Sequence, residues 1–380
     1  MRVAIIHYWL VNMRGGEKVV EALCRMFPQA DIYTHVRDED ILSKTLKKHA
    51  IKTTFIDKLP FSKKLYQSYL PLMPRALESI DLTGYDLVIS SESGPAKGVI
   101  VPPDTLHLCY CHSPMRYLWD QYHVYKKGAG LPVKIAMPLL AHGLRKWDVT
   151  SAARVDGFIA NSAHVANRIM KYWRRDSDII FPPVSVEDFS PVQPDQLEDY
   201  YLWVGELVGY KKPDLLVEAF NENGKQLIVI GGPEKIRTKL SKTANSNIEF
   251  LGKTDFSTLK AYMARCRALI FPGEEDFGIV PVEVMASGRP VIAYGRGGAL
   301  DTIIDGKTGV LFHEQTVAGL NSAIERFESE VSARIDAQVL AAHAGKFSEG
   351  AFRLALKRLL ERHGIETNLD EHLNALAVAS

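Results

Sequence analysis

The sequence predicts an α/β protein built from two doubly wound domains, each a parallel sheet covered by helices. Short apolar segments alternate with segments of helical periodicity along most of the 380 residues. A proline-rich stretch at 181–196 interrupts this alternation, as an interdomain connection would. We therefore expect domains at 1–185 and 198–350. A helical segment at 351–380 follows them, and its packing against the first domain is one possible arrangement.

The first domain is expected to contain apolar strands bounded by polar, glycine or proline residues. Helical patterns at 16–26 and 163–172 lie among them. Because single helices separate successive strands, the strands should run parallel with right-handed crossovers. The predicted strands are 2–7, 85–90, 105–111 and 157–160.

The second domain repeats this plan, with helices expected at 212–221, 257–265 and 281–287. The chain after residue 312 is expected to be helical, with an amphipathic segment at 352–362. Open parallel sheets bind ligands beyond the carboxyl ends of their strands, so two such domains facing across a cleft would form a deep site. The predicted strands are 201–204, 226–230, 248–251, 268–271 and 290–293.

Composition excludes several classes of protein. Lysine plus arginine (46) nearly balances aspartate plus glutamate (45), so no nucleic-acid partner is expected. Four cysteines without a C-x-x-C pair argue against a disulfide framework or a structural zinc site. The apolar N-terminus contains His7 and lacks a cleavage site, so we interpret it as a strand and not a signal peptide. We expect a cytoplasmic protein that is at most peripheral to a membrane.

The strongest chemical signal is the segment PGEEDFGIVPVE at 272–283. A predicted strand ends before it, and Pro281 occupies the expected first position of a helix, whose N-terminus suits a phosphate. Glu275 on the loop and Glu283 in the first helical turn could both face a ligand, one binding a sugar hydroxyl and the other a ribose diol. Alternatively, Glu283 only stabilises the helix N-terminus and Glu275 is solvated.

Three further candidates follow from residue type and position. Gly15 and Gly16 lack a Cβ and would let a phosphate or sugar approach the backbone, or they form an ordinary turn that opens the helix. Lys211 can neutralise a diphosphate, or it is a solvated surface lysine. His112 follows a predicted strand and could donate a hydrogen bond to a sugar hydroxyl, or it is a satisfied core histidine.

Two stretches of the first domain, 58–77 and 121–147, are locally basic and rich in apolar side chains. Neither stretch contains an acidic residue. Such a surface suits an anionic membrane face or a lipid diphosphate acceptor. The alternative is helices that bury an apolar side while their lysines extend into solvent.

The run from Glu275 to Glu283, with Phe277 and Gly278 inside it, resembles the E-x7-E signature of retaining glycosyltransferases of family 4. The resemblance spans roughly residues 2–312 because further segments agree in the family order. It implies the GT-B fold, two Rossmann-like domains across a cleft, and the segment around His112 is similar to the mannosyltransferase branch. The agreeing segments are 15–18, 111–117, 159–162 with Arg168, 182–184, 205–212, 297–298 and 305–309.

The resemblance also implies roles for individual residues. His112, Glu275 and Lys211 would be catalytic, and Arg116 and Tyr117 would lie on the acceptor side. Two positions depart from the family pattern: Glu206 stands where an arginine usually joins the lysine on the diphosphate, and Asp301 stands where a glutamate is common. The donor-binding residues would be Gly15, Gly16, Lys212, Asp276, Phe277, Gly278, Ile279, Val280 and Glu283.

Most narrowly, the resemblance implies an enzyme that transfers mannose from GDP-mannose to a lipid-linked or oligosaccharide acceptor in bacterial surface polysaccharide biosynthesis. Front-face displacement without a cofactor or metal ion is expected, at the inner face of the membrane if the basic stretches bind lipid. A UDP- or dTDP-sugar donor and a GT-B sugar-nucleotide epimerase stay open. A two-lobed periplasmic binding protein would need a secretory signal, and this sequence shows none. A dehydrogenase would need G-x-G-x-x-G after the first strand, and that motif is absent there.

Overall fold

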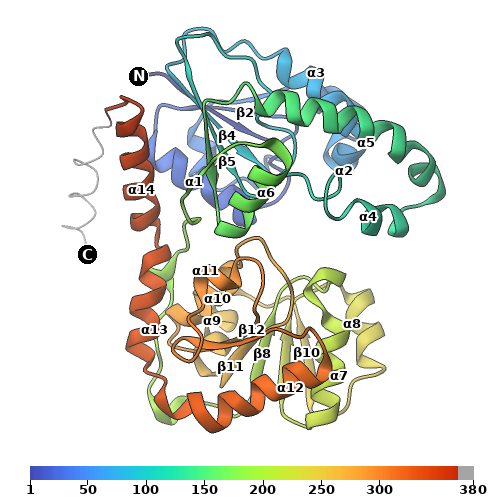
Figure 1. The fold of residues 1–380 in the computed structure, drawn as a ribbon, viewed down its shortest axis with the longest axis vertical. Coiled ribbons are helices and arrows are strands. Elements are labelled where there is room, and N and C mark those ends of the chain that lie inside the picture. The colour runs from blue at the N-terminus through green and yellow to red at the C-terminus, as the bar shows by residue number, and fades with distance from the viewer. Residues whose placement is uncertain (367–380) are drawn as a thin grey trace. The chain divides into compact units, whose positions relative to one another are not determined.

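The computed structural model describes residues 1–366, and the chain divides into two compact units (Figure 1). The first unit combines Met1–Pro182 with the described residues from Phe352 onward, and the second is Pro183–Ala351. The division therefore falls inside the proline-rich stretch at 181–196. Of the helical segment expected at 351–380, residues 367–380 lie outside the described part.

The first unit contains a seven-stranded parallel sheet in the order β3-β2-β1-β4-β5-β6-β7. All four predicted strands are present, each within two residues of its expected ends. Three short strands, β2, β3 and β7, were not predicted. The bounds are β1 Val3–His7, β2 Asp31–Thr34, β3 Ile51–Thr53, β4 Leu87–Glu92, β5 Leu106–Cys111, β6 Gly157–Ala160 and β7 Asp178–Ile179.

Helices pack on both faces of this sheet because alternate residues of β1 point to opposite sides. Val3 and Ile5 join the core under α1 and α14, whereas Ala4 and Ile6 pack with Leu77 of α3. The helices are α1 Gly15–Met26, α2 Ser62–Leu65, α3 Met73–Glu78, α4 Tyr122–Gly128, α5 Leu131–Ala152, α6 Ala163–Trp173 and the later part of α14 Glu349–Arg362.

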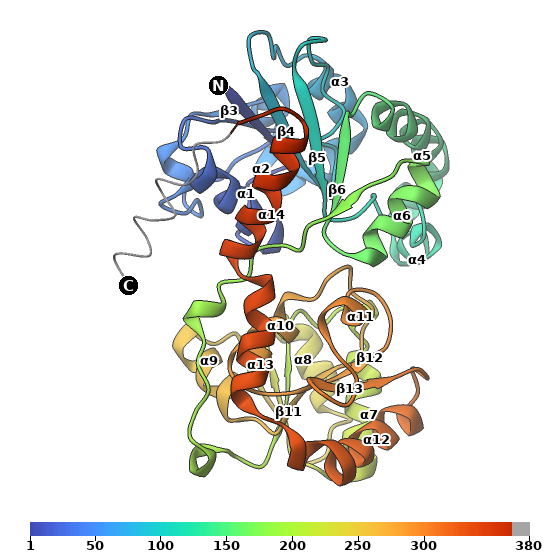
Figure 2. The same cartoon turned by 60° about the vertical axis from the view of Figure 1, so that its left-hand side comes forward.

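Helix α14 supplies an apolar stripe to the first unit, and Figure 2 shows it beside the strands. Phe352, Leu356, Leu359 and Leu360 are buried in the same cluster as residues of β1, β4 and β5. The ring of Phe352 lies edge-on to Tyr110 of β5, with ring centroids 5.8 Å apart. The amphipathic pattern at 352–362 thus corresponds to a helix whose apolar side covers the sheet.

The second unit contains a six-stranded parallel sheet in the order β10-β9-β8-β11-β12-β13. All five predicted strands are confirmed, and β13 is additional. The strands are β8 Tyr201–Val204, β9 Leu227–Ile230, β10 Ile248–Gly252, β11 Ala268–Phe271, β12 Val291–Tyr294 and β13 Gly309–Phe312. The helices are α7 Pro213–Asn223, α8 Glu234–Ser241, α9 Phe256–Arg265, α10 Ile279–Ala286, α11 Ala299–Thr302, α12 Val317–Arg326 and α13 Ala337–Ala344.

Both sheets follow the same winding rule, in which the first three strands run outward in one direction and the fourth lies on the other side of the first. The order reverses between β1 and β4 in the first unit and between β8 and β11 in the second. Ligands of such sheets bind beyond the strand ends at this switch point. The predicted α/β class with two Rossmann-like domains is therefore confirmed, and the winding identifies where each unit should bind a ligand.

Candidate functional site

The switch point of the second unit brings together two predicted site residues. Lys211 ends a 3₁₀ turn, Gly209–Lys211, that follows β8, and Glu275 lies on the loop that follows β11. The Nζ atom of Lys211 lies 2.7 Å from Oε1 of Glu275. Their side chains are 14% and 20% exposed, so the ion pair is sheltered but accessible. A diphosphate and a sugar hydroxyl could each find a partner here.

Glycines allow the two loops to approach this closely. A Cβ atom on Gly273 would lie 2.7 Å from the Cα of Lys211, and one on Gly205 would lie 3.0 Å from the Lys211 Nζ. Gly205 also has a φ of +151°, which side-chain-bearing residues rarely adopt. The lysine is therefore held against the acidic loop by backbone contacts.

The glycine pair at 297–298 supports the acidic loop from another side. The Gly298 N–H donates to the carbonyl oxygen of Glu275 at 2.9 Å. A Cβ on Gly298 would lie 2.3 Å from both the Cα and the carbonyl oxygen of Phe277, and one on Gly297 would lie 2.2 Å from the Glu275 oxygen. The backbone of residues 275–277 is thus fixed by a segment that tolerates no side chain.

Helix α10 begins two residues earlier than the sequence predicted. Gly278, with a φ of +88°, is its N-cap, and Ile279 is its first residue. Pro281 is therefore the third helical residue and not the first, and half-buried Glu283 lies in the second turn and not the first. With this earlier start, the N–H groups in the first turn of α10 still have no carbonyl partner within the helix.

The remaining donor-side candidates differ in what their side chains offer. The Phe277 side chain is only 4% exposed and packs edge-on to Phe347, so residue 277 would present backbone alone to a ligand. Asp276 is partly exposed on the same loop. Lys212 was expected to begin a helix. It is instead the exposed N-cap of α7, with a φ of +56°. Glu206 is exposed after β8.

The switch point of the first unit places His112 beside Gly16. His112 directly follows β5, and its Nε2 lies 2.9 Å from the Ser91 Oγ of β4. A Cβ on Gly16 would lie 3.6 Å from the His112 Nε2 and 2.5 Å from the Tyr8 hydroxyl. Burial lowers the pKa of His112 to about 3, so the imidazole is neutral. Gly15 is the first residue of α1.

The loop that carries Arg116 and Tyr117 is anchored by Arg168 of α6. Its guanidinium donates to Asp120 Oδ1 at 2.6 Å and to the Pro114 carbonyl at 3.2 Å. Arg116 Nε lies 3.5 Å from the other Asp120 oxygen. The Tyr117 ring lies edge-on to Tyr125, and burial raises its pKa well above the ordinary value.

Sequence reasoning missed three polar residues around His112. His7 and Ser91 lie at the carboxyl ends of β1 and β4, and Glu17 lies in the first turn of α1. All three side chains are buried, at 1%, 0% and 1% exposure respectively. The available signal was position, because His7 is the last residue of a predicted strand and Glu17 directly follows the glycine pair.

Segment 121–147 shows features of both interpretations. Every residue of 131–140, the first part of α5, is exposed or partly exposed. Apolar burial occurs elsewhere in the segment, since Tyr122, Ala141 and Leu144 are buried and Met137 packs against them. We call its exposed apolar residues and lysines the α4–α5 surface: Val124, Tyr125, Lys126, Lys127, Leu131, Val133, Lys134, Ile135, Leu139 and Leu140.

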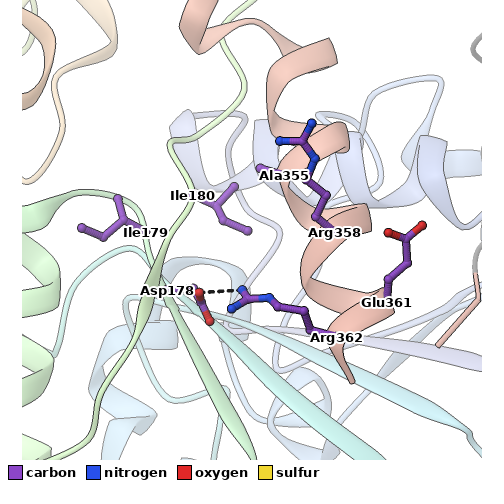
Figure 3. A pocket seen from close by; sticks show the side chains of 7 residues that line it. All are labelled: Asp178, Ile179, Ile180, Ala355, Arg358, Glu361 and Arg362. Atoms are coloured by element: carbon purple, nitrogen blue, oxygen red, sulfur yellow. Dashed lines mark hydrogen bonds and ion pairs between the residues drawn. The ribbon is translucent and has the colours of Figure 1, made fainter. Parts of the chain in front are cut away.

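A separate hollow in the first unit lies between β7 and α14 (Figure 3). Arg362 crosses it to form a 2.6 Å ion pair with Asp178. Its lining includes none of the predicted site residues, so we do not assign it to the candidate site. Within residues 1–366, no helix is both long and apolar enough to cross a bilayer, and no group of three potential metal ligands occurs.

Comparison with solved structures defines the fold class. The protein is similar to Anabaena Alr3699/HepE in complex with UDP and glucose, with a TM-score of 0.70 and 17% identity over 95% of this chain and 99% of that chain. It is likewise similar to sucrose-phosphate synthase from Thermosynechococcus elongatus, with a TM-score of 0.70 and 19% identity over 95% and 98% of the two chains. These neighbours are GT-B glycosyltransferases, and the similarity confirms the predicted GT-B fold.

Sequence comparison points to the same class. Residues 186–338 match the family model of the glycosyl transferases group 1. An uncharacterized glycosyltransferase of Methanocaldococcus jannaschii, MJ1178, is 34% identical over 130 residues, which are 33% of this chain and 37% of that protein. The alpha-1,3/1,6-mannosyltransferase ALG2 of Saccharomyces cerevisiae is 26% identical over 51% of this chain and 47% of that protein. The chain thus spans half or less of these relatives, and the similarities support a transferase.

Proposed function

We propose that the protein is a retaining glycosyltransferase that moves a hexose from a nucleoside-diphosphate sugar to a glycan acceptor. The observation that carries this proposal is the 2.7 Å pair of Lys211 and Glu275 at the switch point of the second unit, close in sequence to the N-terminus of α10. The group 1 match covers this whole region. It offers a cation and helix N–H groups for phosphate, and a carboxylate for a sugar hydroxyl.

Each residue has a distinct part in the proposed reaction. Lys211 and the N-terminus of α10 stabilise the negative charge that develops on the leaving diphosphate. Glu275 orients the donor sugar, Glu283 binds the ribose, and His112 hydrogen-bonds a sugar hydroxyl. The leaving phosphate deprotonates the acceptor hydroxyl during front-face displacement, so no protein nucleophile or metal ion is needed.

Variants of Lys211 and Glu283 test this assignment. We expect Lys211→Ala and Glu283→Ala each to lower kcat/KM for sugar transfer at least about tenfold, which corresponds to ~1.4 kcal/mol of barrier. Lys242→Ala, which removes an exposed lysine after α8, is the matched control and should transfer normally. Near-normal transfer by both site variants would refute the assignment.

For the donor we propose GDP-mannose. The similarity to the mannosyltransferase ALG2 of yeast supports mannose over other hexoses. A UDP-sugar is the alternative, because the HepE structure is a complex with UDP and glucose. A thermal-shift series with GDP-mannose, UDP-glucose, UDP-N-acetylglucosamine and dTDP-rhamnose distinguishes them, since the true donor stabilises the folded protein by mass action. An epimerase would instead convert the donor sugar without any acceptor.

For the acceptor we propose a lipid-linked saccharide, presented at an anionic membrane face that the α4–α5 surface contacts. Leu131, Ile135 and Leu139 are 71%, 69% and 81% exposed, although large apolar side chains are usually buried. Lys126, Lys127 and Lys134 are interspersed with them, and segment 121–147 contains no acid. Apolar anchors among lysines match the acyl boundary and the head groups of anionic lipids.

Vesicle co-sedimentation tests this contact. The protein should bind phosphatidylserine-containing vesicles and release them at high salt, because charge attraction is screened. Replacing Leu131, Ile135 and Leu139 with serine should weaken binding at least about tenfold, since each buried apolar side chain contributes ~1.5–3 kcal/mol. Replacing Leu300 and Ile304 with serine is the control, as these exposed residues lie in the second unit. Absence of vesicle binding by the wild type would overturn the proposal. A dimer of the wild type that the triple variant abolishes would also overturn it, because the α4–α5 surface would then be covered by a second copy.

A further inference from the structure

Four polar side chains of the first unit form a continuous chain that ends at His112. The His7 Nε2 lies 3.7 Å from Oε1 of Glu17, an electrostatic contact that is too long for a hydrogen bond, and the His7 Nδ1 lies 3.0 Å from the Ser91 Oγ. The Ser91 Oγ in turn lies 2.9 Å from the His112 Nε2. Strand β1 supplies His7, β4 supplies Ser91, and His112 directly follows β5. Helix α1 supplies Glu17.

Glu17 is held in its ionised form at the end of this chain. Burial acts to raise its pKa, but the interaction with His7 and the Arg14 N–H outweighs burial, so the net shift is downward. The Arg14 N–H donates to the Glu17 Oε2 at 2.9 Å, which leaves Oε1 directed to His7. An ionised carboxylate only accepts hydrogen bonds, so it favours a hydrogen on the facing imidazole nitrogen.

The positions of the hydrogens follow from this constraint. A neutral imidazole with its hydrogen on Nε2 has an accepting Nδ1, so the Ser91 hydroxyl donates to His7. The Ser91 oxygen then accepts from the His112 Nε2–H. Because burial keeps His112 neutral, its Nδ1 is left without a hydrogen and becomes an acceptor. With a single hydrogen on the His7 ring, the charge of Glu17 favours one direction for both hydrogen bonds, from Ser91 to His7 and from His112 to Ser91.

We propose that Glu17, His7 and Ser91 are positioning residues that fix His112 in the tautomer with hydrogen on Nε2 and an accepting Nδ1. This inference rests on the proposed function only for the ligand, a sugar hydroxyl that donates to the His112 Nδ1. No atom of the three positioning residues needs to touch the substrate. Without these three side chains, the His112 ring would stay in place but could adopt both tautomers. Its hydrogen bond to the sugar hydroxyl would then be lost in part of the molecules.

The chain has a matched control within the same strand. Ser90 is also fully buried in β4, and its Oγ lies 2.9 Å from the Nε2 of His107. Since neighbouring strand residues point to opposite faces, Ser90→Ala removes an equivalent serine–histidine hydrogen bond away from His112. Ser91→Ala and Ser90→Ala should therefore both lower the midpoint of urea unfolding, whereas only Ser91→Ala should affect His112.

Nitrogen NMR of protein labelled with ¹⁵N-histidine measures the tautomer without substrate, and His112→Gln identifies the His112 signals. We expect a single Nε2–H tautomer in the wild type and in Ser90→Ala, and a mixture in Ser91→Ala. Glu17→Leu and Glu17→Gln, which both remove the charge, should also give a mixture. An Nδ1–H tautomer in the wild type, or an unchanged one in Ser91→Ala, overturns the inference.

Transfer kinetics separate this inference from the proposed function. We expect kcat of Ser91→Ala to fall about tenfold to a hundredfold, comparable to other losses of a group that orients an imidazole, with little change in KM. Ser90→Ala should transfer like the wild type. If the wild type transfers sugar and both serine variants do so equally, the positioning role fails while the proposed function stands. If the wild type does not transfer sugar, the proposed function fails and the NMR result still decides the tautomer.

Discussion

Replacing Gly298 with alanine tests whether the acidic loop must keep its position to within about an ångström. The φ of Gly298 is −68°, which alanine adopts without strain, so the substitution acts through space alone. The new methyl group would lie 2.3 Å from two backbone atoms of Phe277, whereas ordinary contact begins at 3.4 Å. The loop that carries Glu275 must therefore retreat by about 1 Å.

The expected loss follows from this displacement. A misplacement of 1 Å at a reacting centre costs about a hundredfold in rate, which is ~2.7 kcal/mol of barrier. The retreat also lengthens the 2.9 Å hydrogen bond from the Gly298 N–H to the Glu275 carbonyl. We therefore expect kcat/KM of Gly298→Ala to fall about a hundredfold, together with weaker binding of the nucleotide sugar.

The measurement is sugar transfer with a saturating acceptor, accompanied by circular dichroism and thermal unfolding to show that the variant is folded. Gly345→Ala is the matched control, because Gly345 has a φ of −54° and nothing lies within 4 Å of the added Cβ. It should transfer sugar normally. Transfer by folded Gly298→Ala within threefold of the wild type would show that the loop position does not limit the reaction.

Three further predictions concern the core and the proposal that the reaction needs no metal ion. Lys97→Met leaves the buried carboxylates of Glu92 and Asp148 without their cation, so urea unfolding should show a loss of about 3–5 kcal/mol; a loss below 1 kcal/mol would contradict this. Phe352→Ala opens a cavity beside Tyr110 and should cost about 3–5 kcal/mol in the same assay, whereas an unchanged midpoint would show that α14 contributes little to the core. Treatment with EDTA should leave transfer intact, and a full loss that Mn²⁺ restores would refute the metal-free reaction.

The sequence predicted the central strands well because they are continuous apolar runs. β4 and β11 are buried along their whole length, and their neighbours on both sides hide both faces. The missed strands lack this signal: β2 alternates between buried and partly buried residues, and β7 has only two residues. Pairing with an already formed sheet, which is a tertiary effect, defines such edge strands.

Helix α5 illustrates a different limit of sequence reasoning. Its segment 131–140 is apolar except for Lys134 and contains Pro138, so no helical period separates a buried side from an exposed one. The sequence therefore left two interpretations of equal standing. The folded unit covers Tyr122, Ala141 and Leu144 and leaves most of 131–140 exposed, because burial depends on which neighbours cover the helix.

For the candidate site, the sequence supplied residue types but not their contacts. The motif around Glu275 and the lysine at 211 are 64 positions apart, and their meeting depends on β8 and β11 being neighbours in the sheet. The start of α10 was misplaced because Pro281 was taken as the first helical residue, whereas Gly278 already ends the loop with a positive φ. His7 was overlooked because an apolar strand with one histidine resembles an ordinary core strand.

The two switch points differ in the chemical groups that they present. The second unit presents the partly exposed charges of Lys211 and Glu275 with a helix N-terminus, as a charged diphosphate requires. The first unit presents His112, which is neutral and hydrogen-bonded to Ser91, and the bare backbone of Gly16. A neutral acceptor discriminates among uncharged hydroxyl groups without attracting a phosphate, because it carries no charge to neutralise. We therefore expect Lys211→Ala to weaken binding of the proposed donor, and Ser91→Ala to change the choice of sugar through the tautomer of His112.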